Sequence, residues 1–487
     1  MTEIRPPPLL HPHPSSPRMA LPGCFAAFFR RNRVGVNHPE PRYKVERPRI
    51  LPDYRMTTRF FKSITTCDNF YTDPPNWWLN TDADPPAYSP GDESVIDQKL
   101  DELSPLLRQL SLDIHSHPET AFQEIYAHDL LTTFMADNGF KVTKSYLGIA
   151  TAFRAEFHHG KGGRTLGVNS EYDALKGIGH ACGHNLIAVA GVGVALTLKA
   201  ALEAHDICGR IVLLGTPAEE GGGGKILLLN GGGYQEMDLC VMCHPSTGPK
   251  HSANVGTCIT VQEIEVEYVG RSAHAGAAPW EGTNALDAAF LAYSGISVLR
   301  QQMRPENRIH GTIEGNQDWA PNVIPDYAKM RWLVRTPTRT ELTSLVERVK
   351  RCFEAAALAT SCEIKMNLAA PYLDLNQNQV LGKEFSDVLM KRYGMHTMSR
   401  AGSASTDFGN VSYALPALHP GFAIPTELNG GNHTIGFTRA AASLHAHEAT
   451  LAVAKGLAHT ALRALRDDEF FQQVKESFRK PRQDLSI

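Results

Sequence analysis

Apolar side chains recur at helical spacing along the first strongly patterned stretch of the chain, residues 94–116. They are Ile96, Leu100, Leu103, Leu106, Leu107 and Leu110. Positions three and four apart share one face of a helix, so this spacing predicts an amphipathic helix. Pro105 falls inside the run and indicates either a kink or a fresh helix start.

Helical and strand patterns then alternate up to residue 242. Helices are expected at residues 123–138 and 186–203, and strands at 151–157, 165–169, 210–215 and 238–242. Such alternation predicts an α/β layer with a mostly parallel sheet. The apolar run 186–198 is interrupted by two glycines and Thr197 and is too short to span a bilayer. It predicts a buried helix, and no membrane partner is expected.

The pattern changes near residue 256. Strand-like alternation at 260–269, 308–313, 325–335 and 362–368, with helical spacing at 284–302 and 339–359, gives the order β-α-β-β-α-β. That order predicts a ferredoxin-like domain. Helical patterns resume at 380–393 and, as one long amphipathic helix, at 438–466, with a polar loop at 402–408 between them. A smaller domain therefore interrupts the α/β layer, and a ligand cleft is expected at their junction.

These patterns divide the chain into four segments. They are a proline-rich extension (1–92), the first part of the α/β domain (93–256), the inserted domain (257–371) and the second part of the α/β domain (372–487). Dense prolines oppose helix and sheet, so the extension is expected to be extended or disordered. Its residues 19–33 carry positive charge after the apolar stretch, unlike a secretory signal. A mitochondrial presequence stays open as an alternative.

Composition limits the classes of function. Of 487 residues, 42% are hydrophobic and 20% charged, with a net charge of −3. These values are typical of a globular protein, and they give no basic field that would bind nucleic acid. The nine cysteines have no regular spacing, so reduced thiols in the cytoplasm are the simplest expectation.

Metal-ligating residue types gather between residues 171 and 220. Cys182 and His184 are separated by one residue, so a short turn can bring thiolate and imidazole to one point, as zinc or a similar metal requires. Glu219 and Glu220 follow an expected strand, where one carboxylate can bind metal and the other can transfer protons. The following run 221–224 is all glycine, but its spacing to Lys225 does not match a phosphate-binding loop.

The order of motifs resembles the aminoacylase/carboxypeptidase family of two-metal peptidases, in its branch of dipeptidases and amino-acid-conjugate amidohydrolases. The similar motifs are Glu171-Tyr172-Asp173-Ala174-Leu175, His180-Ala181-Cys182-Gly183-His184, Thr216-Pro217-Ala218-Glu219-Glu220, Cys243-His244-Pro245, Ser272-Ala273-His274, Pro321-Asn322-Val323-Ile324-Pro325 and Asn432-His433-Thr434. The resemblance covers about residues 94–466. It implies a catalytic α/β domain with two divalent metal ions and an inserted lid, through which two chains form a homodimer.

The resemblance also implies roles for single residues. The implied metal ligands are Cys182, His184, Glu220, His244 and His433. Glu219 would be the general base, and Asp173 would orient a ligand. Many family members carry a His-x-Asp element where this chain has Glu171-Tyr172-Asp173. The choice between zinc and manganese therefore stays open.

Three residues of the lid complete the expected site. The resemblance implies that His274 stabilises the oxyanion, often across a dimer interface, and Asn322 has matching amide chemistry. Arg335 could hold the substrate's carboxylate with its guanidinium. The structural alternatives are an exposed loop histidine, an asparagine turn and a surface arginine.

The motifs together predict a metal-dependent hydrolase of small amide bonds. The Glu-Tyr-Asp-Ala-Leu and Gly-His-Ala-Cys-Gly-His-Asn forms resemble most those of dipeptidases that cleave dipeptides with a basic residue. An amidohydrolase of N-acyl or auxin-type amino-acid conjugates is the alternative activity. A catalytically silent homologue that binds such conjugates is the alternative from another class.

Overall fold

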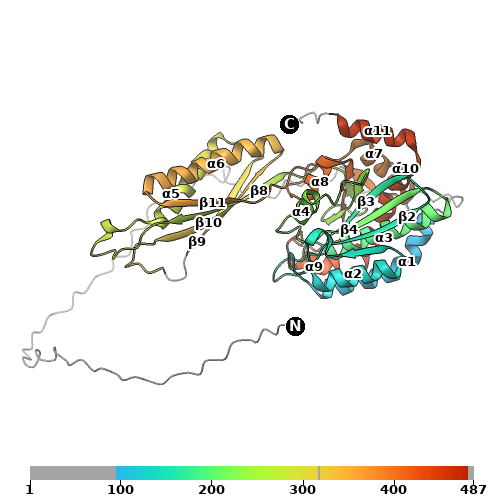
Figure 1. Ribbon diagram of the computed structural model, residues 1–487, viewed down its shortest axis with the longest axis horizontal. Helices are drawn as coiled ribbons and strands as arrows, with labels where there is room; N and C mark the ends of the chain where they lie inside the picture. The colour runs from blue at the N-terminus through green and yellow to red at the C-terminus, as the bar shows by residue number, and fades with distance from the viewer. Residues whose placement is uncertain (1–94, 316–318, 481–487) are drawn as a thin grey trace, which may run out of the picture. The chain divides into compact units, whose positions relative to one another are not determined.

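The computed structural model describes residues 95–315 and 319–480, all within one structural unit, Asn80–Ile487 (Figure 1). The proline-rich extension expected over residues 1–92 lies outside the described residues. That expectation and the expected segment boundaries stay predictions, whereas the α/β fold class is confirmed by the sheets of the molecule.

The larger sheet is mixed. Its strand order is β1-β2-β4-β3-β5-β13. The strands are β1 (Lys141–Lys144), β2 (Phe153–His159), β3 (Arg164–Ser170), β4 (Gly209–Gly215), β5 (Leu239–Val241) and β13 (Ala417–Leu418). Strands β4, β3, β5 and β13 pair in parallel, as expected, and β1 and β2 add an antiparallel edge.

Helices cover both faces of this sheet. They are α1 (Val95–Ser116), α2 (Ile125–Asp137), α3 (His184–Ala204), α4 (Gly224–Asn230), α7 (Gln379–Tyr393), α8 (Phe408–Ala414), α9 (Ile435–Ala441), α10 (Leu444–Arg466) and α11 (Asp468–Arg479). Alternate residues of β4 show the two faces: Ile211 and Leu213 pack in the core with α1, α3 and α10, and Val212 and Leu214 pack with α4 and α8. The sheet is therefore the middle layer of three.

Helix α3 is the central helix of the larger core. Its length and hydropathy would suffice to cross a membrane, but 89% of that window is buried inside the protein. It contacts β3 and β4 as well as α1 and α10 (Figure 1). The expected buried helix is confirmed, and it begins at a candidate metal ligand, His184.

The inserted domain has the expected ferredoxin-like order. Its antiparallel sheet runs β11-β8-β10-β9. The elements are β8 (Thr260–Val269), α5 (Ala285–Val298), β9 (Arg308–Gly315), β10 (Tyr327–Thr336), α6 (Arg339–Thr360) and β11 (Glu363–Leu368). Helices α5 and α6 lie along one face (Figure 1) and bury Ile264, Val266 and Trp332. The opposite face carries charged pairs such as Lys329 with Glu265 and Arg331 with Glu314.

The structure corrects three details of the sequence interpretation. The helix expected over 438–466 is two helices, α9 and α10, because the Ser443 side chain accepts a hydrogen bond from Ala446 N and starts a new helix. Pro105 does not end α1, which continues through it. Helices α4 and α11 and a small sheet were not expected. The small sheet runs β12 (His396–Met398), β7 (Ser252–Asn254), β14 (Gly421–Ala423) and β6 (His244–Ser246).

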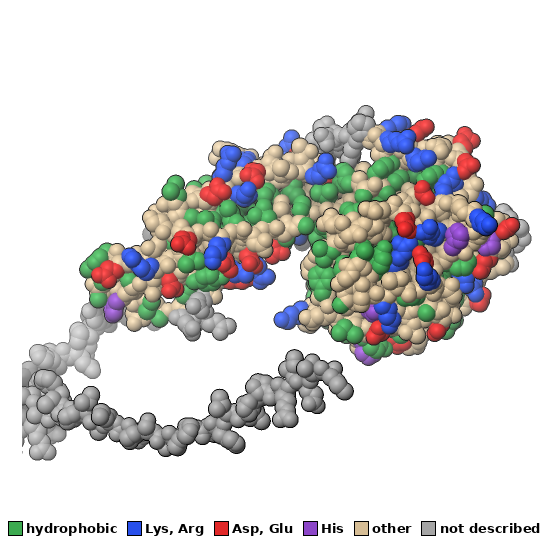
Figure 2. Space-filling model, viewed as in Figure 1, with side chains coloured by type: hydrophobic (Ala, Val, Ile, Leu, Met, Phe, Trp, Pro, Cys, Tyr) green, Lys and Arg blue, Asp and Glu red, His purple; other side chains and the backbone are tan. Residues whose placement is uncertain are grey.

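Basic and acidic side chains are interspersed over the face of the molecule shown in Figure 2. No large surface of one charge dominates that view. The face therefore lacks the basic stripe that a nucleic-acid site needs, in agreement with the small net charge of the chain.

Candidate active site

A tight turn at the start of α3 presents the first two candidate ligands. Gly183, between Cys182 and His184, has φ 76°, and a Cβ there would lie 2.6 Å from Pro245 Cγ. Glycine therefore allows the close approach of the turn to the strand that carries His244. Cys182 Sγ lies 3.4 Å from His244 Nε2 and 3.5 Å from His433 Nε2. Burial would raise the pKa of this thiol, but His244 and its neighbours lower it to about 6.

Hydrogen bonds fix which nitrogen of each imidazole faces the centre. His184 Nδ1 lies 3.0 Å from Asp173 Oδ1, and His244 Nδ1 lies 2.8 Å from the carbonyl oxygen of Pro245. Both acceptors require a proton on Nδ1, so Nε2 of each ring is the nitrogen that would bind a metal. Asp173 also accepts a hydrogen bond of 2.9 Å from the backbone N–H of Glu220. Asp173 thus contacts the side chain of one candidate ligand and the backbone of another, and its predicted role in orienting a ligand stays a prediction.

The five residues predicted as metal ligands come together in space. Two overlapping groups, Cys182 with His184 and His244, and Cys182 with Glu220 and His433, each hold their ligand atoms within 4.8 Å of one another. Nε2 of His184 and Oε1 of Glu220 are buried and have no hydrogen-bond partner among the described residues. Buried polar atoms normally have a partner, and thiolate, imidazole and carboxylate are ligands for zinc and its neighbours. The residues present therefore fit a metal centre.

Glu219 lies at the edge of this cluster in a tightly held turn. Ala218 adopts a left-handed φ of 58°, and its N–H donates a 2.9 Å hydrogen bond to Glu124 Oε1. The hydroxyl of Tyr372 donates to the carbonyl oxygen of Glu219 at 2.9 Å. Burial, with the charges of Glu171 and Glu220, raises the pKa of Glu219 well above its usual range. A carboxyl with a raised pKa in a metal cluster suits proton transfer.

Sequence reasoning missed the residues that support this turn. Glu124 is buried and also accepts a 2.8 Å hydrogen bond from the Thr151 hydroxyl. Gly224 permits the return of the chain after the glutamates, because a Cβ there would lie 1.9 Å from the carbonyl oxygen of Pro217. This close approach explains the last glycine of the run. The contact of Glu124 spans 94 residues, so no local pattern could have revealed it.

A second missed group lies beneath the metal cluster. Lys225 Nζ is 2.5 Å from Glu171 Oε1 and 2.5 Å from Asp407 Oδ1, and all three side chains are fully buried. Burial lowers the pKa of Lys225, but Asp407 and Glu171 raise it well above its usual range. Glu171 also reaches the cluster, because Glu171, His184 and Glu219 form a third group of possible ligand atoms within 4.8 Å.

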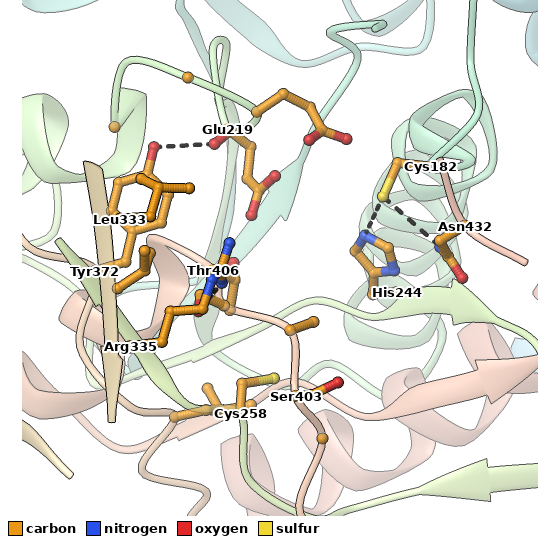
Figure 3. Close-up of a pocket in the computed structure, with 18 of the residues that line it drawn as sticks. Cys182, Glu219, His244, Cys258, Leu333, Arg335, Tyr372, Ser403, Thr406 and Asn432 are labelled. Atoms are coloured by element: carbon orange, nitrogen blue, oxygen red, sulfur yellow. Dashed lines mark hydrogen bonds between the residues drawn. The ribbon is translucent and has the colours of Figure 1, made fainter. Parts of the chain in front are cut away.

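A cavity of about 1030 Å³ is lined by Glu219 and by four of the five candidate ligands, all but the buried His184. Figure 3 shows Cys182, His244 and Asn432 at one side of it and Tyr372, Leu333 and Arg335 at the other. The guanidinium of Arg335 donates a 2.9 Å hydrogen bond to Ser405 Oγ and contacts His310. It has no carboxylate partner in the part of the chain that the structure describes. The candidate base, four of the candidate metal ligands and the substrate arginine thus line one cavity.

His274 and Asn322 do not line this cavity. They lie together on exposed loops of the inserted domain, where Ala275 N donates a 2.9 Å hydrogen bond to Asn322 O. Nδ1 of His274 accepts hydrogen bonds from the N–H groups of Gly276 and Ala277, both 3.2 Å. The ring proton is therefore on Nε2, which can donate outward. The catalytic roles of His274 and Asn322 stay predictions.

Comparison with known proteins identifies the family. The sequence profile of Peptidase family M20/M25/M40 matches residues 167–446, which include the five candidate ligands and Glu219. The chain belongs to this peptidase family. It is 41% identical over 398 residues to the Xaa-Arg dipeptidase of Mus musculus and 39% identical over 399 residues to that of Homo sapiens. Each match covers 78% of this chain, with 91% of the mouse protein and 90% of the human one.

More distant proteins share the fold or part of the sequence. A p-aminobenzoyl-glutamate hydrolase subunit from Escherichia coli is 26% identical over 441 residues, 74% of this chain and 90% of that protein. A dinuclear metal-binding peptidase of the M20 family from Bacillus subtilis has a similar structure, with a TM-score of 0.57, 20% identity, and coverage of 75% of this chain and 99% of that one. The aminobenzoyl-glutamate utilization protein from Klebsiella pneumoniae has a TM-score of 0.59 and 19% identity, covering 76% and 99%. The fold of this M20-family chain is therefore shared widely.

Proposed function

We propose that the chain is a metal-dependent dipeptidase that uses two divalent cations, zinc or manganese. The observation that carries the proposal is the cavity lined by Glu219, Arg335 and members of both overlapping ligand groups. The names of the two mammalian relatives, at 41% and 39% identity, support a dipeptidase. The solved dinuclear peptidase supports two metals.

The residues of this chain divide the reaction between them. When bound, the metals would supply an activated water and polarise the carbonyl of the scissile bond. Glu219 takes the proton of the attacking water at its carboxylate and passes it to the leaving amine. Its raised pKa suits both steps, because the carboxyl must first accept and then release the proton. Asp173 keeps Nδ1 of His184 protonated and thereby keeps its Nε2 available to the metals.

Two charged side chains of the lid strands suggest the substrate. Arg335 on β10 has free guanidinium donors, and a bidentate fork is suited to the C-terminal carboxylate of a dipeptide. Glu263 on β8 lines the same cavity and has no ion-pair partner among the described residues. An unpaired carboxylate there favours a basic side chain on the C-terminal residue of the substrate. The Xaa-Arg preference named for the mammalian relatives agrees with this assignment.

The assignment is tested with purified protein, loaded with zinc or with manganese, and a substrate panel. The panel holds dipeptides ending in Arg, Lys, Ala and Glu, and N-acyl amino acids. Dipeptides ending in Arg or Lys should be cleaved fastest, and Glu263→Gln should raise KM for them while sparing dipeptides ending in Ala. Arg335→Met should raise KM for every dipeptide, because the carboxylate is common to all.

The same panel separates the alternatives. The relationship to a p-aminobenzoyl-glutamate hydrolase favours an amidohydrolase of N-acyl amino acids as the second candidate. Cleavage of the N-acyl compounds without cleavage of dipeptides would establish that activity instead. Binding of dipeptides without turnover by the metal-loaded protein would establish a silent homologue.

We also propose that two chains pair through the lid as a homodimer. His274 carries its proton on the outward Nε2, so it can donate to the oxyanion in the neighbouring chain's cavity. An exposed edge strand, such as β9 or β11 in the order β11-β8-β10-β9, is suited to pairing across a twofold axis. Pairing of this kind would explain why His274 does not line the cavity of its own chain.

A further inference from the structure

The buried ion cluster of Lys225, Glu171 and Asp407 has no assigned step in the proposed reaction, although the charge of Glu171 helps to raise the pKa of Glu219. Lys225 Nζ lies 2.5 Å from one oxygen of each carboxylate, and its backbone N–H donates a 2.8 Å hydrogen bond to Asp407 Oδ2. None of the three side chains is exposed to solvent. Burial of charge is costly even in a pair, and two apolar residues would serve a purely structural contact as well. The cluster therefore calls for a functional explanation.

The second carboxylate oxygen of Glu171 indicates a function for the cluster. Glu171 Oε1 faces Lys225, whereas Oε2 faces the metal cluster and lies 3.5 Å from His184 Nε2. Neither this oxygen nor His184 Nε2 has a hydrogen-bond partner among the described residues, and both are buried. His184 Nδ1 already donates to Asp173, so Nε2 is the ring nitrogen that would give its lone pair to a cation in place of a proton. A carboxylate oxygen and an imidazole lone pair that face each other across this distance leave room for a shared cation.

We propose that Glu171 is a further ligand of the metal centre and that Lys225 is its positioning residue. This inference rests on the metal centre of the proposed function. Lys225 holds Oε1, so that Glu171 offers the single oxygen Oε2 to the metal. The ammonium group also balances the charges of Glu171 and Asp407, with which it forms ion pairs. Asp407, at the N-terminus of α8, fixes Lys225 from the opposite side.

Metal binding by four proteins tests the proposal without any substrate. They are the wild-type chain, Glu171→Gln, Lys225→Met and the double variant. Each is stripped with a chelator and titrated with zinc and with manganese by calorimetry, and metal content after dialysis is measured by mass spectrometry. Lys329→Met is the matched control, because Lys329 forms a 2.7 Å ion pair with Glu265 on the lid, away from the metals.

Both single variants should bind at least one of the two metals about 10–100-fold more weakly, the usual loss when a residue that holds or orients a ligand is removed. The double variant should lose no more affinity than Glu171→Gln alone, since Lys225 acts through Glu171. Lys329→Met should bind both metals as the wild-type chain does. Thermal unfolding of the stripped proteins shows whether each variant is folded.

Three results would overturn the proposal. Wild-type affinity in Glu171→Gln would remove Glu171 from the metal centre. Losses that multiply in the double variant would show that Lys225 acts independently of Glu171. A wild-type chain that takes up no metal would overturn the proposed metal centre itself.

If Lys225→Met does not fold, a variant that combines Lys225→Met with Asp407→Asn removes both charges together. Glu171→Gln keeps the Lys225–Asp407 pair, so it decides the ligand role by itself. Metal titration is separate from the dipeptide panel, so a chain with another substrate still gives a decisive result.

Discussion

Glu124→Gln should change how the stability of the protein depends on pH. Burial raises the pKa of Glu124 from its ordinary 4.5 to about 7, so folding favours the protonated carboxyl. The stability from this group is complete below pH 4.5 and is lost as the pH rises towards about 7. At about 1.4 kcal/mol for each pKa unit the loss is about 3 kcal/mol, with about 2 kcal/mol of it between pH 5 and pH 8. Glutamine does not titrate and removes this loss.

The two hydrogen bonds of Glu124 make glutamine a good substitute. Its amide oxygen can accept from Ala218 N, and its NH₂ group can donate to the Thr151 hydroxyl, as a protonated carboxyl would. Glu124→Ala, in contrast, leaves both partners buried without a hydrogen bond. Each buried partner without a hydrogen bond costs about 1–3 kcal/mol, so Glu124→Ala should be less stable by about 2–6 kcal/mol at every pH.

Urea unfolding of the metal-free proteins, followed by circular dichroism at several pH values from 5 to 8, measures both effects. Wild type and Glu124→Gln are compared at each pH, so that all other titrating groups cancel. The free energy of unfolding of Glu124→Gln, relative to that of the wild-type protein, should rise by about 2 kcal/mol between pH 5 and pH 8. A stability difference that stays constant over this range would refute the reasoning.

Three further predictions follow from the site. Glu219→Gln should keep metal content and lower kcat by about 10²–10⁴, because proton transfer is lost; normal kcat would exclude Glu219 as the base. His274→Ala should be metallated but inactive, and mixing it with Glu219→Gln should restore activity once subunits exchange, because one cavity then holds both residues. A monomer by light scattering, or mixtures that stay inactive despite exchange, would contradict the shared site. Chelation should lower the free energy of unfolding, by about 4 kcal/mol when the free metal had been at a thousandfold its Kd; an unchanged urea midpoint would argue against metal binding by the folded state.

The elements with strong periodicity could be predicted from the sequence. The strand expected at 260–269 is β8 (Thr260–Val269), and the helix expected at 339–359 is α6 (Arg339–Thr360). Each buries one face and exposes the other, which leaves a clear pattern of period two or 3.6. Three-residue strands such as β6 and β7 are too short for such a pattern. Helix α4 begins in the glycine run, where local propensity argues against a helix.

The site shows the same division between local and distant information. Cys182 and His184 converge through a turn of one residue, so their spacing, together with the motifs that follow in the chain, indicated a metal site. Lys225 and Asp407 lie 182 residues apart in the chain, and each resembles an ordinary surface charge in the sequence. Similarly, Ser443 suits the exposed face of one long helix as well as the cap of a new one. Only the tertiary structure distinguishes those readings.

The two candidate metal positions differ in their access to solvent. The side chain of His184 is fully buried at the start of the core helix α3, whereas that of His433 is 57% exposed. A cation held with His184 cannot leave by fraying of that helix, because the helix is locked in the core. The cation beside Glu220 and His433 can instead exchange through the cavity. Cys182 and His244 open the inner position to the same cavity, so both cations should exchange through it, the outer one faster because solvent reaches its ligand His433 directly.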